Sequence, residues 1–146
     1  MPKDDFDVWF IFGPALEAYA EDSTGSVEVR DWADRLPAAD FDALLLFLVD
    51  AGYRQNSGSF TEAVISWADF RDELKRALTR FGCMKAAELV DSALVIGERR
   101  EREEDTSEMM LEREEIDRVE DFTHRKVISY LTEHADAFSI DIRPML

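Results

Sequence analysis

Two histidines, His124 and His134, are the side chains that could exchange protons near neutral pH. If both lie on one helix, their separation turns the second ring about 280° from the first. Asp121 precedes His124 by three residues, and Glu120 precedes it by four. Either spacing lets a carboxylate and an imidazole on one helix bind the same metal ion. Helical two-metal sites repeat this motif on a second helix, and no other segment has a histidine for it. We therefore expect a surface histidine beside acids and no metal, with a metal-binding or enzymatic helical protein as an alternative.

The single cysteine, Cys83, follows Gly82 near an expected helix start, where the helix dipole favours a thiolate. No base is expected beside it, so we predict a small buried thiol. One cysteine excludes an internal disulfide and a multi-cysteine zinc site. The chain also lacks a P-loop, a dinucleotide fingerprint, a G-x-S-x-G elbow and an H-E-x-x-H motif. We expect neither catalysis nor a cofactor.

Carboxylates are the most abundant reactive groups, because 33 acidic residues face 17 basic ones and the net charge is −16. The excess lies at the two ends: residues 1–60 and 101–146 each carry −8, and residues 61–100 are neutral. Such a field repels nucleic acid and anionic membranes and attracts basic protein surfaces. The expected partner is therefore a basic protein, with no direct contact to nucleic acid or membrane. Acidity that serves only solubility, or that reflects a salt-adapted proteome, is the alternative.

The chain has the length and apolar content of one domain, residues 1–146. Its apolar start, Phe6 to Phe12, is too short for a signal peptide or a spanning helix, so we expect a cytoplasmic protein. Pro14 should break or kink this segment at Gly13, with a short helix after it. So apolar a segment could also cover a second copy of the chain, which makes a homodimer a possibility.

Helical periodicity dominates the middle of the chain. Phe41 to Val49 follow the i, i+3, i+4, i+7 pattern of a buried helix, and Gly52 stands where it should end. Ser59 and Glu62 match a capping box for a helix that begins at Phe60. Two more helical stripes follow at 70–81 and 84–96, each followed by glycine.

The last third of the chain contains an uninterrupted charged run. Residues 98–105 have no apolar side chain and predict a solvated helix end or a mobile connection. Asp105 and Glu108 then suit the cap of a last long helix that extends to Phe138. We find no convincing pair of strands, so the expected class is all-α, with about six helices.

One part of the chain resembles a known family. The likeness lies in residues 52–63, which read GYRQNSGSFTEA, in residues 77–90, which read ALTRFGCMKAAELV, and in the segment from Tyr130 to Phe138. These residues resemble the DNA-mimic protein family of small, acidic, helical bacterial proteins, over about residues 36–138. The family loop is the tighter Asn-Gly-Gly-Phe, and an alanine is common where this chain has Cys83. Asn56, Gly58 and Phe60 are the corresponding loop residues, with an expected structural role.

The resemblance implies a protein that covers the DNA-binding face of a transcription factor, although most members lack an assigned activity. DNA-binding proteins gain affinity from Lys and Arg on phosphates, so a rigid array of carboxylates can compete for them. Glu114, Asp117 and Asp121 stand at i, i+3, i+7 and should form one acidic row on the last helix. If the charged run is helical, four more carboxylates extend the row: Glu101, Glu104, Asp105 and Glu108.

Two other interpretations of the row remain open. Arginines interrupt it, and an exposed helix with i, i+4 salt pairs would have the same sequence pattern. A small acidic helical protein is also suited to be an immunity or antitoxin protein that blocks a basic nuclease.

Overall fold

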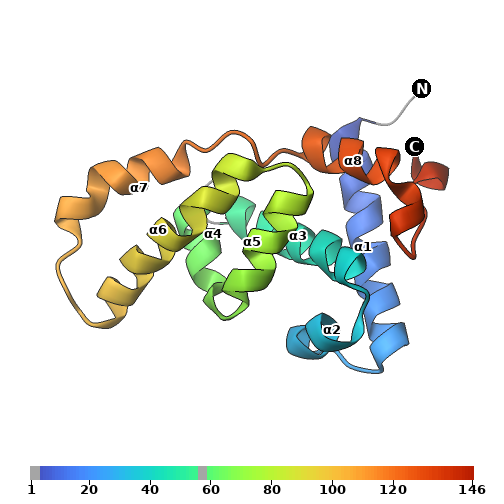
Figure 1. Cartoon of the computed structure of the whole chain (residues 1–146), viewed down its shortest axis with the longest axis horizontal. Coiled ribbons are helices and arrows are strands. Elements are labelled where there is room, and N and C mark those ends of the chain that lie inside the picture. The colour runs from blue at the N-terminus through green and yellow to red at the C-terminus, as the bar shows by residue number, and fades with distance from the viewer. Residues whose placement is uncertain (1–3, 56–58) are drawn as a thin grey trace.

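A computed structural model describes residues 4–55 and 59–146 (Figure 1). In these residues the chain forms eight α-helices and four short 3-10 turns, with no strand. The all-α expectation is confirmed, but six helices is too few. The helices are α1 (Asp5–Thr24), α2 (Val29–Arg35), α3 (Ala38–Gln55), α4 (Phe60–Ser66), α5 (Arg71–Arg80), α6 (Met84–Glu101), α7 (Met110–Asp117) and α8 (His124–Glu133).

Helix α1 does not break at Gly13 as expected; it runs through Pro14 and ends at Gly25, which has a φ of 68°. Its start is capped by Asp4, whose carboxylate accepts the amide hydrogen of Asp7. A proline removes only one helical hydrogen bond. Four side chains on one face of α1 are buried in the core and hold the helix together across that position: Trp9, Phe12, Leu16 and Ala20.

Helix α3 is the centre of the molecule, because α1, α4 and α5 all pack against it. Every residue from Phe41 to Leu46 is buried. The helix continues past Gly52 to Gln55, contrary to the expected end. Tyr53 still packs there, since its ring centre lies 6.4 Å from that of Phe60.

Helices α4, α5 and α6 follow the predicted periodicity closely. Ser59 caps α4 by accepting the amide hydrogen of Glu62 at 3.2 Å, and Phe60 is fully buried, as its anchoring role requires. Gly82 ends the α5 segment with a φ of 79°. Helix α6 continues through Gly97 to Glu101. A side chain at Gly97 would meet Ile65 of α4 at 2.9 Å, so glycine there allows α4 and α6 to pack closely. Asn56 and Gly58 lie outside the described residues.

The expected long final helix is two separate helices. Helix α7 packs on α6 and α4, whereas α8 packs on α1 at the other end of the molecule (Figure 1). Residues 118–123 connect them, and Thr123 caps α8 by accepting the amide hydrogen of Lys126. Helix α2 lies between α1 and α3 in the sequence; its Trp32 is buried and donates its indole N–H to the Ser26 carbonyl oxygen at 2.8 Å.

No helix in the described ranges combines the length and the apolar character that a membrane crossing requires.

Candidate functional site

The end of α6, the loop after it and α7 form a hairpin at one end of the molecule (Figure 1). We call residues 98–117 the acidic arm. Two large apolar side chains, Met110 and Leu111, are 59% and 80% exposed on it. Nine carboxylates on the arm are exposed as well: Glu98, Glu101, Glu103, Glu104, Asp105, Glu108, Glu112, Glu114 and Glu115.

Two arginines of this region pair with a carboxylate outside the arm. Arg100 from α6 and Arg113 from α7 both bind Glu62 of α4, a carboxylate that is only 25% exposed. Arg113 lies 2.9 Å from its Oε1 atom. The bond to Arg100 keeps the pKa of Glu62 below its ordinary value, although burial opposes this effect. These arginines therefore anchor the arm, and they interrupt its outer surface less than the sequence suggested.

The remaining arginines make exposed pairs within the arm or at its end. Arg99 lies 2.6 Å from Glu108, and Arg102 lies 3.8 Å from Glu104. Pairs as exposed as these contribute little stability. Among the described residues, no basic group lies within 4.0 Å of the carboxylates of four arm residues: Glu101, Glu103, Glu112 and Glu115.

Asp117 caps another helix. Its Oδ1 atom accepts the amide hydrogen of Thr61 at 2.9 Å, and the Ser59 hydroxyl donates to it at 3.2 Å. Both donors belong to the start of α4, where free amide hydrogens need acceptors. Asp117 therefore fixes the end of the arm to α4.

Asp121 caps the start of α6 in the same way. Its carboxylate accepts the amide hydrogens of Lys85 at 2.7 Å and Ala86 at 3.1 Å. Cys83, the residue before α6, does not cap the helix with its own side chain, so Asp121 provides the cap from a distant part of the sequence. The missing local cap was the signal in the sequence that could have indicated such a contact.

The expected row of Glu114, Asp117 and Asp121 is therefore not a row on one helix, because α7 ends at Asp117. Glu114 is exposed and lies 3.9 Å from Arg118. The charged run is helical only as far as Glu101, so Glu104, Asp105 and Glu108 do not extend a helical row; they lie in the loop and the 3-10 turn before α7. Asp105 accepts the amide hydrogen of Ser107, and this bond lowers its pKa.

The two histidines lie apart, as their spacing predicted. His124 begins α8, and its Nε2 atom lies 3.2 Å from Oδ2 of the buried Asp50. Trp9 donates its indole N–H to the same oxygen at 2.9 Å. His134 instead packs against Tyr130, with ring centres 4.2 Å apart.

Asp121 and His124 thus contact different helices. The described residues hold no group of three or more metal-ligating side chains.

Cys83 is fully buried, as predicted. Burial raises the pKa of its thiol to about 12, and the nearby charge of Asp121 adds to the effect. At neutral pH this side chain is a neutral thiol, so it lacks the thiolate form of a nucleophile.

Besides Asp50, two more buried aspartates on α3 were not anticipated from the sequence. Asp42 is completely buried and binds Arg76 and Arg80 of α5. Asp40 accepts hydrogen bonds from the Ser139 amide at 2.9 Å and from the Tyr19 hydroxyl at 3.0 Å. Their position among the apolar residues of α3 was the available signal, because a buried charge requires partners.

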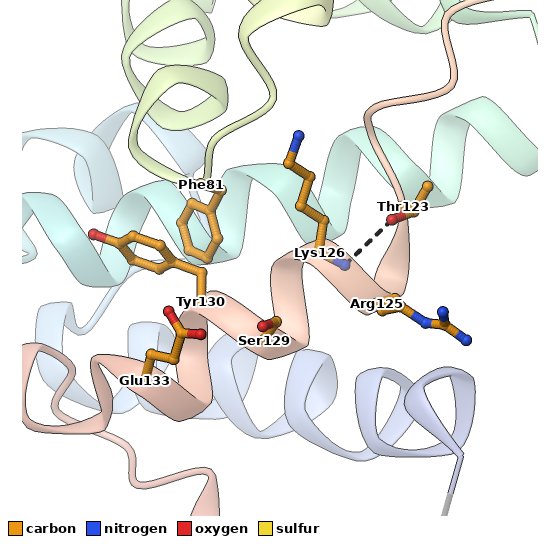
Figure 2. Close-up of a pocket in the computed structure, with 7 residues that line it drawn as sticks. All are labelled: Phe81, Thr123, Arg125, Lys126, Ser129, Tyr130 and Glu133. Carbon is orange, nitrogen blue, oxygen red and sulfur yellow. Dashed lines mark hydrogen bonds between the residues drawn. The ribbon is translucent and has the colours of Figure 1, made fainter.

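A second surface lies where the α5–α6 turn meets α8. Tyr130 stands between two hollows, and Figure 2 shows the one in front of Phe81, with Lys126 and Glu133 at its edges. This hollow measures about 440 Å³. The hollow on the α5 side of Tyr130 measures about 540 Å³ and is lined by Lys75, Arg76, Thr79 and Arg80. We call this second one the α5 hollow.

Comparison of the chain with protein-family models, with curated proteins and with solved structures found no match.

Proposed function

We propose that this protein is a non-catalytic interaction protein whose acidic arm binds a basic surface of another protein, in the manner of a DNA mimic. The observation that supports the proposal is the exposure of nine carboxylates on one short hairpin. A DNA-binding protein presents Lys and Arg where phosphates would lie, so carboxylates held in a fixed arrangement compete for the same groups.

The anchoring of the arm supports this role. Glu62 ties both of its helices to α4, and Asp117 binds the start of α4. A carboxylate array fixed in this way loses little conformational entropy when it binds. The arm is therefore suited to recognise a fixed pattern of positive charge.

Exposed apolar groups define the expected partner further. Met110 and Leu111 lie among the carboxylates, and Met110 also lines a hollow of about 420 Å³ between α6 and α7. A basic face that also carries an apolar side chain would bury these two residues. A DNA-binding helix has this character when it contacts thymine methyl groups as well as phosphates.

The test is capture at low salt on the immobilised chain, followed by competition. We expect a basic DNA-binding protein to be retained, and to be released both by salt and by its own duplex DNA. The variant Glu101→Gln/Glu112→Gln/Glu115→Gln should weaken retention by about tenfold or more, because these carboxylates have no basic partner in the part of the chain that the structure describes.

A matched control removes the same charge elsewhere. Glu21, Asp22 and Glu28 are exposed beside the α1–α2 turn, away from the arm. The variant Glu21→Gln/Asp22→Asn/Glu28→Gln should retain the partner within about threefold of the original chain. Equal losses in the two variants would mean that net charge, and not the arm, is recognised. Retention that duplex DNA does not reverse would exclude DNA mimicry.

A further inference from the structure

Helix α5 gathers positive charge in a chain whose net charge is −16. Four basic side chains, those of Arg71, Lys75, Arg76 and Arg80, lie along it. In the described structure they meet only two carboxylates: Arg71 and Lys75 share Asp91, and Arg76 and Arg80 share Asp42. Asp72 and Glu73 on the same helix offset part of this charge. Three of the four cations, Lys75, Arg76 and Arg80, border the α5 hollow.

Asp42 fixes the direction of both guanidinium groups. Arg76 donates to its Oδ1 atom from Nε at 2.9 Å and from Nη2 at 2.6 Å, and Arg80 donates to Oδ2 from Nε at 2.6 Å. The carboxylate is fully buried, yet the arginine side chains remain 45% and 30% exposed. Each guanidinium has five N–H groups, so donors remain on the exposed side of both.

These donors border the α5 hollow, whose lining contains no acidic residue. Its lining is Lys75, Arg76, Thr79, Arg80 and Tyr130. The Thr79 hydroxyl already donates to the Lys75 carbonyl oxygen. The Tyr130 hydroxyl interacts with Arg80. Recognition in the hollow therefore depends mainly on the ammonium and guanidinium groups.

The aromatic wall does not provide a free stacking surface. Phe81 and His134 both pack against Tyr130, with ring centres 4.6 Å and 4.2 Å away. A ligand held here would be recognised by its charge and its acceptor oxygens. A phosphate monoester has three acceptor oxygens and about two negative charges, which suit the three cations that border the hollow and the guanidinium donors that do not bind Asp42.

We propose that the α5 hollow binds the phosphate group of a small phosphorylated molecule. The surrounding charge selects against larger polyanions, because nucleic acid or an anionic membrane would be repelled by the rest of the surface. A single phosphate needs only the few ångströms around Arg76 and Arg80.

The test is a titration of the isotope-labelled full chain at constant ionic strength, followed by NMR. The two probes are inorganic phosphate and glycerol 3-phosphate. We expect saturable shifts of the amide signals of residues 75–80 and Tyr130 with either probe. Tighter binding of glycerol 3-phosphate assigns the hollow to organic phosphates, and equal affinity assigns it to inorganic phosphate. Shifts that never saturate, or that appear across the whole surface, would overturn the proposal.

Lys75→Gln is the variant of choice, because Arg71 still binds Asp91 and the buried Asp42 is not disturbed. It should weaken phosphate binding by about fivefold or more. Arg102→Gln removes the same charge at the end of α6, eleven residues and thus about 16 Å along the helix from Asp91, the residue that binds Lys75. This control should change the affinity by less than about twofold.

Two results with these variants would contradict the proposal. The first is an equal loss of affinity in Lys75→Gln and Arg102→Gln. The second is the appearance of the same amide shifts on raising the protein concentration without phosphate, since this would assign the hollow to an acidic segment of a second copy.

Discussion

Glu62 holds three helices together through one carboxylate. It belongs to α4 and binds Arg100 of α6 and Arg113 of α7, and it is three-quarters buried. Its pKa is lowered mainly by the hydrogen bond from Arg100. A carboxylate whose pKa is lower in the folded than in the unfolded chain stabilises the fold above the unfolded pKa. That contribution is lost as the pH falls through the folded pKa.

We therefore expect Glu62→Gln to destabilise the protein at neutral pH and to have less effect in acid. Glu62 has an ordinary pKa of 4.5, so the difference between the two chains should begin to shrink below that pH. Urea unfolding at about pH 7 and about pH 3 measures it. Glu21→Gln, on an exposed part of α1, is the control and should show no pH-dependent difference. A difference for Glu62→Gln that stays constant across this range would contradict the assigned role.

The bonding partners of the buried Asp40 and Asp42 on α3 cannot be predicted from residue type alone. The sequence places Asp40 and Asp42 in an apolar helix, but their partners come from α1, α5 and the segment after α8. Ser139 lies 99 positions from Asp40. No local spacing predicts such a contact, because it depends on how the helices are arranged.

Two helices, α1 and α3, approach each other closely at Gly13. A methyl group there would overlap the ring of Phe47. The ring of Phe47 also packs edge-on against Trp9, with centres 5.4 Å apart. The close approach is a further reason why α1 remains one helix: a break at Gly13 would remove this contact.

We expect Gly13→Ala to destabilise the protein by about 1–3 kcal/mol, because the extra methyl group overpacks this contact. Gly52→Ala is the matched control in α3, since among the described residues outside its own helix the nearest atom to the added methyl group is the Trp67 indole nitrogen, at 4.0 Å. It should be neutral or stabilise the protein by up to about 1 kcal/mol, as alanine is the better helix former. Chemical denaturation measures both, and effects of equal sign would contradict the packing argument.

Periodicity predicted the elements whose buried faces are continuous. The stripe from Phe41 to Val49 gave α3, and the serine cap located the start of α4. Periodicity failed between α7 and α8, because Ile116, Val119 and Phe122 continue an apolar pattern across a connection that is not helical. In this segment Asp117 caps α4 and Asp121 caps α6. These long-range hydrogen bonds outweighed the local preference of the segment for helix.

At the scale of the whole molecule, the charge of −16 opposes folding. Compaction brings the carboxylates of the arm closer together than they are in the unfolded chain, and salt screens this repulsion. The exposed ion pairs that salt also weakens contribute little.

We therefore expect the melting temperature to rise between about 0.02 M and 0.5 M sodium chloride. Calorimetry at several salt concentrations measures it. The variant Glu101→Gln/Glu112→Gln/Glu115→Gln should melt higher at low salt and respond less to added salt. A melting temperature that falls with salt would mean that attractive pairs dominate the surface.

The connection between α7 and α8 is tied down at two points, by Asp117 on α4 and by Asp121 on α6. These bonds restrain the arm, because α7 cannot move away from the core without breaking the hydrogen bond by which Asp117 caps α4. Asp117 and Asp121, which the sequence pattern assigned to partner binding, thus hold the fold together. A partner that pulled on either would loosen the fold, so recognition falls to the carboxylates beyond them on the arm.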